Sequence, residues 1–127
     1  AEAWLAPMVQ RGTALVAHVD GRSQEIVGFA VAGAWHSYEG YARTVEDSIY
    51  LSPAVQGHGL GSRLLAALIE ASRAAGDRTM IALIEAGNVA SVRLHERYGF
   101  TIVGTVPQAG EKLGQLLDLT LMSRSLH

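Results

Sequence analysis

The chain has 127 residues, about half of them hydrophobic, and a formal net charge of −2. This length suits one domain, residues 1–127, that can bury a substantial core. The weak charge gives no reason to expect a nucleic acid or a membrane as partner, and no apolar run approaches the ~20 residues of a membrane span. The absence of cysteine excludes disulfides, thiolate catalysis and cysteine-ligated metals. We therefore expect a cytoplasmic globular protein.

The first part of the sequence predicts a short helix followed by a hairpin and a third strand. Apolar residues recur at helical spacing until Gly12, which is a suitable stop. Turn-forming residues then separate two β-like stretches. In chain order, the predicted elements are a helix over 1–11, strands over 13–19 and 25–35 around a turn at 20–23, a polar and aromatic loop over 36–42, and a strand over 44–51.

The remainder of the sequence alternates helices with strands. A helix over 59–75 carries Leu60, Leu64, Leu68 and Ala71 on one stripe and ends at Gly76-Asp77. The elements that follow are a strand over 79–85, a helix over 88–98, and strands over 101–106 and 116–123 around a loop containing Gly and Pro. A strand–helix–strand unit requires a parallel pair with a right-handed crossover. The sequence therefore predicts an α/β fold with a mixed sheet, antiparallel hairpins around a central parallel pair, and helices on both faces.

The run Gln56-Gly57-His58-Gly59-Leu60-Gly61-Ser62 connects a predicted strand to a predicted helix. Glycine lets the backbone approach a ligand closely, and the helix adds free N–H groups and the positive end of its dipole. Together these features indicate a pyrophosphate site. A Walker loop is excluded because G-x-x-x-x-G-K-[ST] is absent. A dinucleotide-binding turn remains an alternative, since Glu85 ends the next strand. A glycine-rich turn that binds no ligand is a second alternative.

The same run resembles the Q/R-x-x-G-x-G/A acyl-CoA motif of the GNAT superfamily of N-acetyltransferases. The segments 44–51, 88–100, 104–106 and 112–118 look like those of phosphinothricin and methionine sulfoximine acetyltransferases. The resemblance implies a GNAT-like fold, acetyl-CoA as cosubstrate, no metal, and transfer of an acetyl group to the amine of a small amino acid or analogue. Members of this group begin with a strand and a helix that would precede Ala1, so we expect one wall of the acceptor pocket to be missing.

The resemblance also implies which residues bind acetyl-CoA. The pantetheine arm would lie where strands 48–51 and 79–85 separate, and the turn would hold the pyrophosphate. Asn88 matches an asparagine that supports the pantetheine, although asparagine is also an excellent helix N-cap, and both roles can hold. The implied cofactor-binding residues are Ile49, Tyr50, Leu51, Gln56, Gly57, His58, Gly59, Leu60, Gly61, Ser62 and Asn88.

Two residues are the catalytic candidates that the resemblance implies. Glu46 matches an acidic residue that accepts the proton of the amine; by alternation it shares a strand face with Ser48 and Tyr50. The alternative for Glu46 is a solvated strand carboxylate. His95 would protonate the departing thiolate or bind substrate, because histidine titrates near neutral pH; the alternative is a hydrogen-bonded core histidine. A strand N–H near Tyr50 or Leu51 is the candidate oxyanion donor.

The resemblance places Tyr41, Arg43 and Lys112 at the substrate. Members of the group are often homodimers, so self-association is a further expectation. The alternatives to an enzyme are a non-catalytic acyl-CoA-binding module and, less favoured, a dinucleotide-binding domain.

Overall fold

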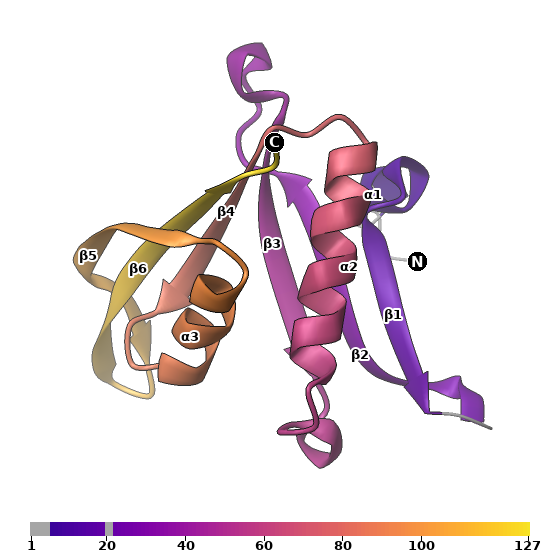
Figure 1. The fold of residues 1–127 in the computed structure, drawn as a ribbon. Helices are drawn as coiled ribbons and strands as arrows, with labels where there is room; N and C mark the ends of the chain where they lie inside the picture. Colours follow the sequence, from indigo (N-terminus) through magenta and orange to yellow (C-terminus); the bar gives the residue numbers. More distant parts are fainter. Residues whose placement is uncertain (1–5, 20–21) are drawn as a thin grey trace.

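A computed structural model describes residues 6–19 and 22–127. The described elements form one six-stranded sheet with helices packed against it (Figure 1). In chain order they are α1 (Ala6–Arg11), β1 (Ala14–Val19), β2 (Arg22–Ala34), the 3₁₀ turn η1 (Glu39–Tyr41), β3 (Thr44–Leu51), the 3₁₀ turn η2 (Pro53–Val55), α2 (Leu60–Ala74), β4 (Thr79–Glu85), α3 (Val89–Arg97), β5 (Thr101–Lys112) and β6 (Gln115–Ser125).

The sheet is mixed, with the strand order β1-β2-β3-β4-β6-β5. β3 and β4 pair in parallel, and the other neighbours pair antiparallel. The helix α2 connects the two parallel strands, as the strand–helix–strand pattern predicted. The mixed α/β architecture expected from the sequence is therefore confirmed.

The main core lies between the sheet and the two later helices, which share one face (Figure 1). Its largest fully buried side chains include Leu65 and Leu68 of α2, Met80 of β4 and Met122 of β6. α1 covers the opposite face, because the Met8 sulfur lies only 2.9 Å from where a Cβ on Gly33 would be. This glycine allows the close approach of helix and sheet.

β3 and β4 stay together only over their first residues. Their register joins Thr44 to Thr79, Val45 to Met80 and Glu46 to Ile81. Beyond this point β3 remains paired with β2 as far as Leu51, and β4 remains paired with β6 as far as Glu85. The two strands diverge towards the end where α2 begins (Figure 1). The sheet therefore opens in its middle.

The structure corrects the prediction for the last hairpin. The loop expected between 106 and 116 is wrong: β5 continues to Lys112 and β6 begins at Gln115. The register shift between Val106 and Gly110 accommodates Pro107 as a bulge on an edge strand, where proline is tolerated. The predicted first helix lies partly outside the described residues. Asp20-Gly21 of the predicted turn also lies outside them, and the other two turn residues, Arg22 and Ser23, belong to β2.

Candidate active site

The glycine-rich turn has the backbone conformation that its sequence predicts. Gly57 and Gly59 have φ angles of 83° and 77°, in the left-handed region that favours glycine. Gly59 is the N-cap of α2. A Cβ atom added to either glycine would meet nothing within 4 Å, so the space beside the turn is open. The turn therefore presents its backbone to a ligand.

The hydrogen bonds of this turn leave its central N–H groups available. The N–H of Gln56 donates to the Pro53 carbonyl over 3.4 Å, and that of Arg63 donates to the Gly59 carbonyl over 3.2 Å. Within the described part of the chain, the N–H groups of residues 57–62 have no backbone acceptor. Gln56 instead braces the turn, because its Nε2 donates to the Leu51 carbonyl over 3.2 Å. The available N–H groups and the helix dipole favour an anion here.

A cleft lies where β3 and β4 separate. One cavity of about 290 Å³ is bounded by both strands and by α3. A second cavity of about 310 Å³ continues towards the glycine turn. The residues common to both are Ile49, Asn88, Ser91 and His95. The open edge of β3 carries backbone groups that no neighbouring strand uses after Glu46, which suits an extended ligand.

Asn88 lies between the two cavities and caps α3. Its Oδ1 accepts a hydrogen bond from the Ser91 N–H over 3.2 Å. The capping alternative raised from the sequence is therefore confirmed. The amide nitrogen of the same side chain can still donate to a ligand, so a ligand-binding role for Asn88 stays a prediction.

Glu46 borders the first cavity from the last paired position of β3. It is half-buried and lies on the face opposite the main core, together with the alternating Ser48 and Tyr50, which are exposed. Partial burial raises the pKa of Glu46, and the charge of Asp47 raises it further. A carboxylate with a raised pKa beside a cavity can accept a proton more readily.

His95 lies in the wall shared by both cavities, with 3% of its surface exposed. Nδ1 contacts the Ser91 carbonyl at 2.8 Å, and Nε2 contacts Oδ2 of Asp47 at 2.8 Å. The ring of Phe100 packs edge-on against the ring of His95, with 4.8 Å between the two ring centroids. Burial by itself lowers the pKa of His95, but the hydrogen bonds that the ring donates to Asp47 and to the Ser91 carbonyl, together with the charge of Asp47, outweigh it and raise that pKa.

Asp47 is the site residue that sequence reasoning missed. It is only 8% exposed, although it is charged. The signal was present: in a strand whose residues alternate, Asp47 shares the core-facing side with Val45 and not the side of Glu46. A carboxylate on that side needs a buried partner, and the partner is His95.

The structure does not bring the three predicted substrate residues together. Tyr41 and Arg43 lie just before β3, at the end of the sheet where β3 and β4 pair. Lys112 lies at the tip of the β5–β6 hairpin, beyond the Glu85 end of β4. The length of β4 alone separates these ends by roughly 20 Å. Their predicted role stays a prediction.

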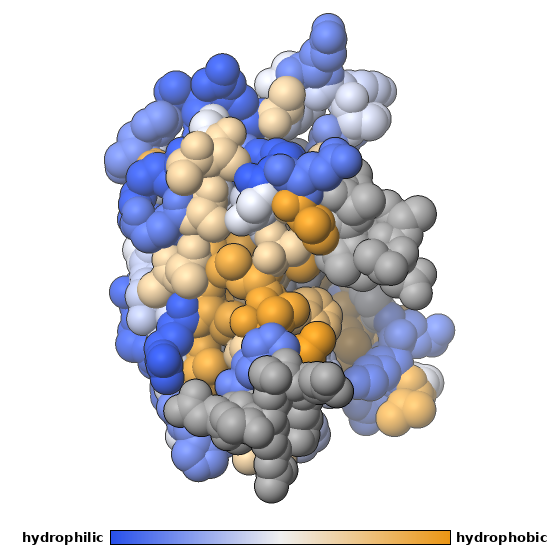
Figure 2. Space-filling view, turned by 90° about the vertical axis from the view of Figure 1, so that its right-hand side faces the viewer, coloured by the Kyte–Doolittle hydropathy of each residue, from blue (hydrophilic) through white to orange (hydrophobic). Residues whose placement is uncertain are grey.

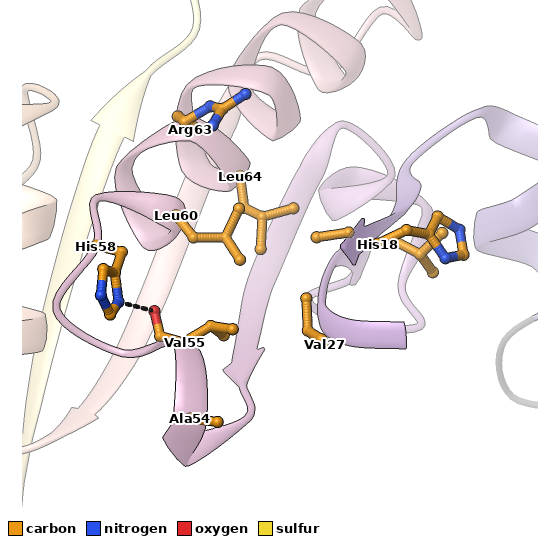
Figure 3. A pocket seen from close by; sticks show the side chains of 10 residues that line it. His18, Val27, Ala54, Val55, His58, Leu60, Arg63 and Leu64 are labelled. Carbon is orange, nitrogen blue, oxygen red and sulfur yellow. Dashed lines mark hydrogen bonds between the residues drawn. The ribbon is translucent and has the colours of Figure 1, made fainter. Parts of the chain in front are cut away.

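A larger hollow of about 740 Å³ lies on the other side of the first turns of α2. Val27, Val55, Leu60 and Leu64 point towards one another across it, while Arg63 is directed away (Figure 3). Figure 2 shows an apolar patch on this side of the molecule. Of the predicted site residues, only His58 and Leu60 line this hollow, and the Nδ1 of His58 lies 3.3 Å from the Val55 carbonyl. Glu46 and His95, which line the cleft between β3 and β4, do not line this hollow.

Comparison with known proteins shows which family this chain belongs to. Residues 3–100 match the model of the Acetyltransferase (GNAT) family. The chain belongs to this family. It is 44% identical to an L-methionine sulfoximine/L-methionine sulfone acetyltransferase of Pseudomonas paraeruginosa over 125 residues, which cover 98% of the chain and 72% of that protein.

Solved structures agree with this assignment. A Salmonella typhimurium protein with its cofactor acetyl-CoA superposes with a TM-score of 0.91 at 42% identity, covering 98% of this chain and 71% of that one. A phosphinothricin acetyltransferase from Sinorhizobium meliloti in complex with acetyl-CoA gives a TM-score of 0.88 at 35% identity, covering 95% and 65%. The family, the fold and the acetyltransferase class predicted from the sequence are confirmed, with acetyl-CoA as the family's cosubstrate.

Among residues 6–19 and 22–127, no group of His, Asp and Glu side chains could hold a metal ion. In the same part of the chain, no helix has the length and apolar character needed to cross a membrane.

Proposed function

We propose that this chain transfers the acetyl group of acetyl-CoA to the amine of a small amino acid or analogue, of the methionine sulfoximine or phosphinothricin type. The cleft between β3 and β4, which ends at an anion-binding turn, is the observation that carries the proposal. The names of the relatives support the substrate class.

The chain offers a matching partner for each part of the cosubstrate. The available N–H groups of 57–62 would hold the pyrophosphate. The open edge of β3 at Ile49 and Leu51 would bind the pantetheine as an added strand, whereas the register with β2 directs the backbone groups of Tyr50 towards Phe29. The thioester supplies an acetyl group that is activated for attack by an amine. Asn88 would donate its amide to the pantetheine from the wall shared by both cavities.

Glu46 would act as the general base. The acceptor amine is protonated at neutral pH and must lose a proton before it can attack. Glu46 borders the cavity where the two strands separate, and its pKa is raised by burial. The proton passes from the amine to its carboxylate, directly or through water, and a backbone N–H near Tyr50 would stabilise the oxyanion. The acid or substrate-ligand role of His95 stays a prediction.

Release of CoA from acetyl-CoA, measured against a panel of amino-acid amines, tests this function. We expect turnover with a small amino acid or analogue, and we expect Glu46→Gln to lower kcat by ~10²–10⁴, the range for loss of a general base. The amide keeps the size of the side chain and removes its basicity. Glu39→Gln, on an exposed turn residue, is the matched control.

A loss of kcat below about threefold in Glu46→Gln would remove Glu46 from this role, because general bases contribute far more. Saturable binding of acetyl-CoA without turnover on any amine would favour the non-catalytic acyl-CoA-binding module. Binding of NAD in place of acetyl-CoA would favour the dinucleotide alternative.

A homodimer in the cytoplasm completes the proposal. The edge strand β5 exposes Ile102, Val103 and Val106, and β6 exposes Leu116. Exposed apolar side chains gathered on one hairpin are typical of interaction surfaces. Sedimentation of the chain over a range of concentrations reads the oligomeric state directly.

A further inference from the structure

We propose that Asp47 and His95 form a positioning pair that fixes the width of the cofactor cleft, and that His95 acts through this pair instead of donating a proton to the reacting groups. The inference rests on the proposed function, since the cleft is taken to bind acetyl-CoA. It assigns a role to Asp47, and it gives His95 a different role from the acid or substrate ligand predicted above.

The hydrogen bonds of His95 leave neither ring nitrogen free for a substrate. A carbonyl can only accept, so Nδ1 carries a hydrogen and donates it to Ser91 at 2.8 Å. Nε2 faces the carboxylate of Asp47 at the same distance. The side chains of His95 and Asp47 are only 4% and 5% exposed. Transfer of a proton to a departing thiolate would require one of these buried contacts to break first.

The location of the pair matches a positioning role. Asp47 occupies the first position of β3 after its pairing with β4 ends. His95 projects from α3, which follows β4 along the chain. The contact therefore joins the two halves of the sheet where they begin to diverge, by a bond between residues 48 positions apart. No backbone ladder joins β3 to β4 at this level in the described register.

The same pair orients the wall of the cleft. His95 holds the Ser91 carbonyl, and the Ser91 N–H is held by Asn88. These three residues line both cavities. A change at Asp47 would thus reach Asn88 through three hydrogen bonds and alter the shared wall of both cavities.

Removing one partner leaves the other buried and unpaired, which costs far more than replacing both. The prediction for each single variant follows. Asp47→Asn and His95→Gln should each raise the Kd of CoA and the KM of acetyl-CoA by ~10-fold, while kcat at saturation changes less than ~3-fold. The double variant, with a neutral pair of amides, should recover most of the lost affinity.

The experiment measures CoA binding by calorimetry and turnover by CoA release for the wild-type protein, the two single variants and the double variant. Glu96→Gln, at the exposed neighbour of His95 on α3, is the matched control and should change neither quantity. Thermal unfolding checks that each variant folds. If a single variant does not fold, the wild-type protein still supplies a test: nitrogen NMR of His95 should show both ring nitrogens carrying hydrogen at pH 7.

Three results would overturn the proposal. The first is a fall of kcat by ~10-fold or more in His95→Gln with the Kd of CoA unchanged, which would make His95 a proton donor. The second is unchanged CoA affinity in both single variants. The third is a ring nitrogen of His95 that carries no hydrogen. If the wild-type chain binds CoA but turns over no amine, the proposed function fails, while the binding and NMR measurements still decide this inference.

Discussion

Two adjacent carboxylates on β3 have opposite environments. Glu46 is half-buried beside the cavity, on the face away from the main core, whereas Asp47 is buried and bonded to His95. The alternation of the strand produces this difference from neighbouring positions. Asp47 also acts on Glu46, because its charge contributes to the raised pKa of the Glu46 carboxyl. The proposed general base and a charge that raises its pKa are thus adjacent in the chain.

The raised pKa of Glu46 predicts the acidic side of the pH–rate profile. The base works only when it is ionised, so kcat/KM should fall as the pH drops through a value above 4.5, the ordinary pKa of this group. Asp47→Asn should move this limb to lower pH, because it removes a negative charge that disfavours ionisation of Glu46. The profile is measured as kcat/KM for the acceptor amine with saturating acetyl-CoA. A limb at or below 4.5 in the wild-type enzyme would contradict the assignment.

The first turn of α2 owes its open backbone to its glycines. Left-handed glycines at 57 and 59 direct the backbone N–H groups towards open space, whereas a Cβ added to Gly61 would lie 3.5 Å from side-chain carbons of Leu51 and Leu94, an ordinary contact. The first two glycines shape the turn. The cradle therefore depends on backbone conformation more than on side chains.

A pair of variants at Gly59 separates charge from conformation. Asp and Asn both tolerate a left-handed conformation better than other side chains, and they are nearly the same size. We expect Gly59→Asp to abolish detectable CoA binding, because it places a negative charge at an anion site, whereas Gly59→Asn should retain most of the affinity. Calorimetry with CoA measures both. Equal affinities in the two variants would argue against a pyrophosphate at this turn.

The described molecule is built on a sheet whose two halves pair at one end and diverge towards the other. β1, β2 and β3 form one antiparallel group, β4, β6 and β5 form another, and the groups meet over three residue pairs. The core between sheet and helices joins them, and the buried pair of Asp47 and His95 lies where they part. Stability and the cofactor cleft are therefore linked.

This link predicts how stability depends on pH. The pKa of His95 is raised in the folded protein above 6.5, so the folded state holds the proton more tightly than the unfolded chain does. The resulting stabilisation is fully present below pH 6.5 and is lost as the pH rises through the folded pKa. Urea unfolding at several pH values should show a falling free energy of unfolding in this window, and His95→Gln should flatten it.

The raised pKa values of Glu46 and Asp77 act in the same direction. Burial also raises the pKa of Asp77, against the opposing influence of its partner Arg11 and of nearby Arg43. A carboxyl with a raised pKa favours the folded state at low pH as well. A stability that increases from pH 6.5 upwards would therefore contradict the assignment of His95 as the stabilising cation.

Local rules determined most of the elements and the motif of this protein. Glycine conformations, apolar periodicity and the N-cap at Asn88 depend on neighbours within a few residues, so the sequence predicted α2, α3, β3, β4 and the phosphate turn with boundaries close to those observed. The last hairpin was predicted poorly because Pro107 and Gly110 indicate a loop unless a bulge in an edge strand accommodates them.

The tertiary structure alone decided which side chains meet. The contact between Asp47 and His95 joins residues 48 positions apart, and it depends on where β3 and β4 separate, which no local pattern specifies. The same packing engages both nitrogens of His95 and sets Lys112 at the other end of the sheet from Tyr41 and Arg43. The residues that could do chemistry were visible in the sequence, but their pairing and their pKa values arise from contacts between distant segments.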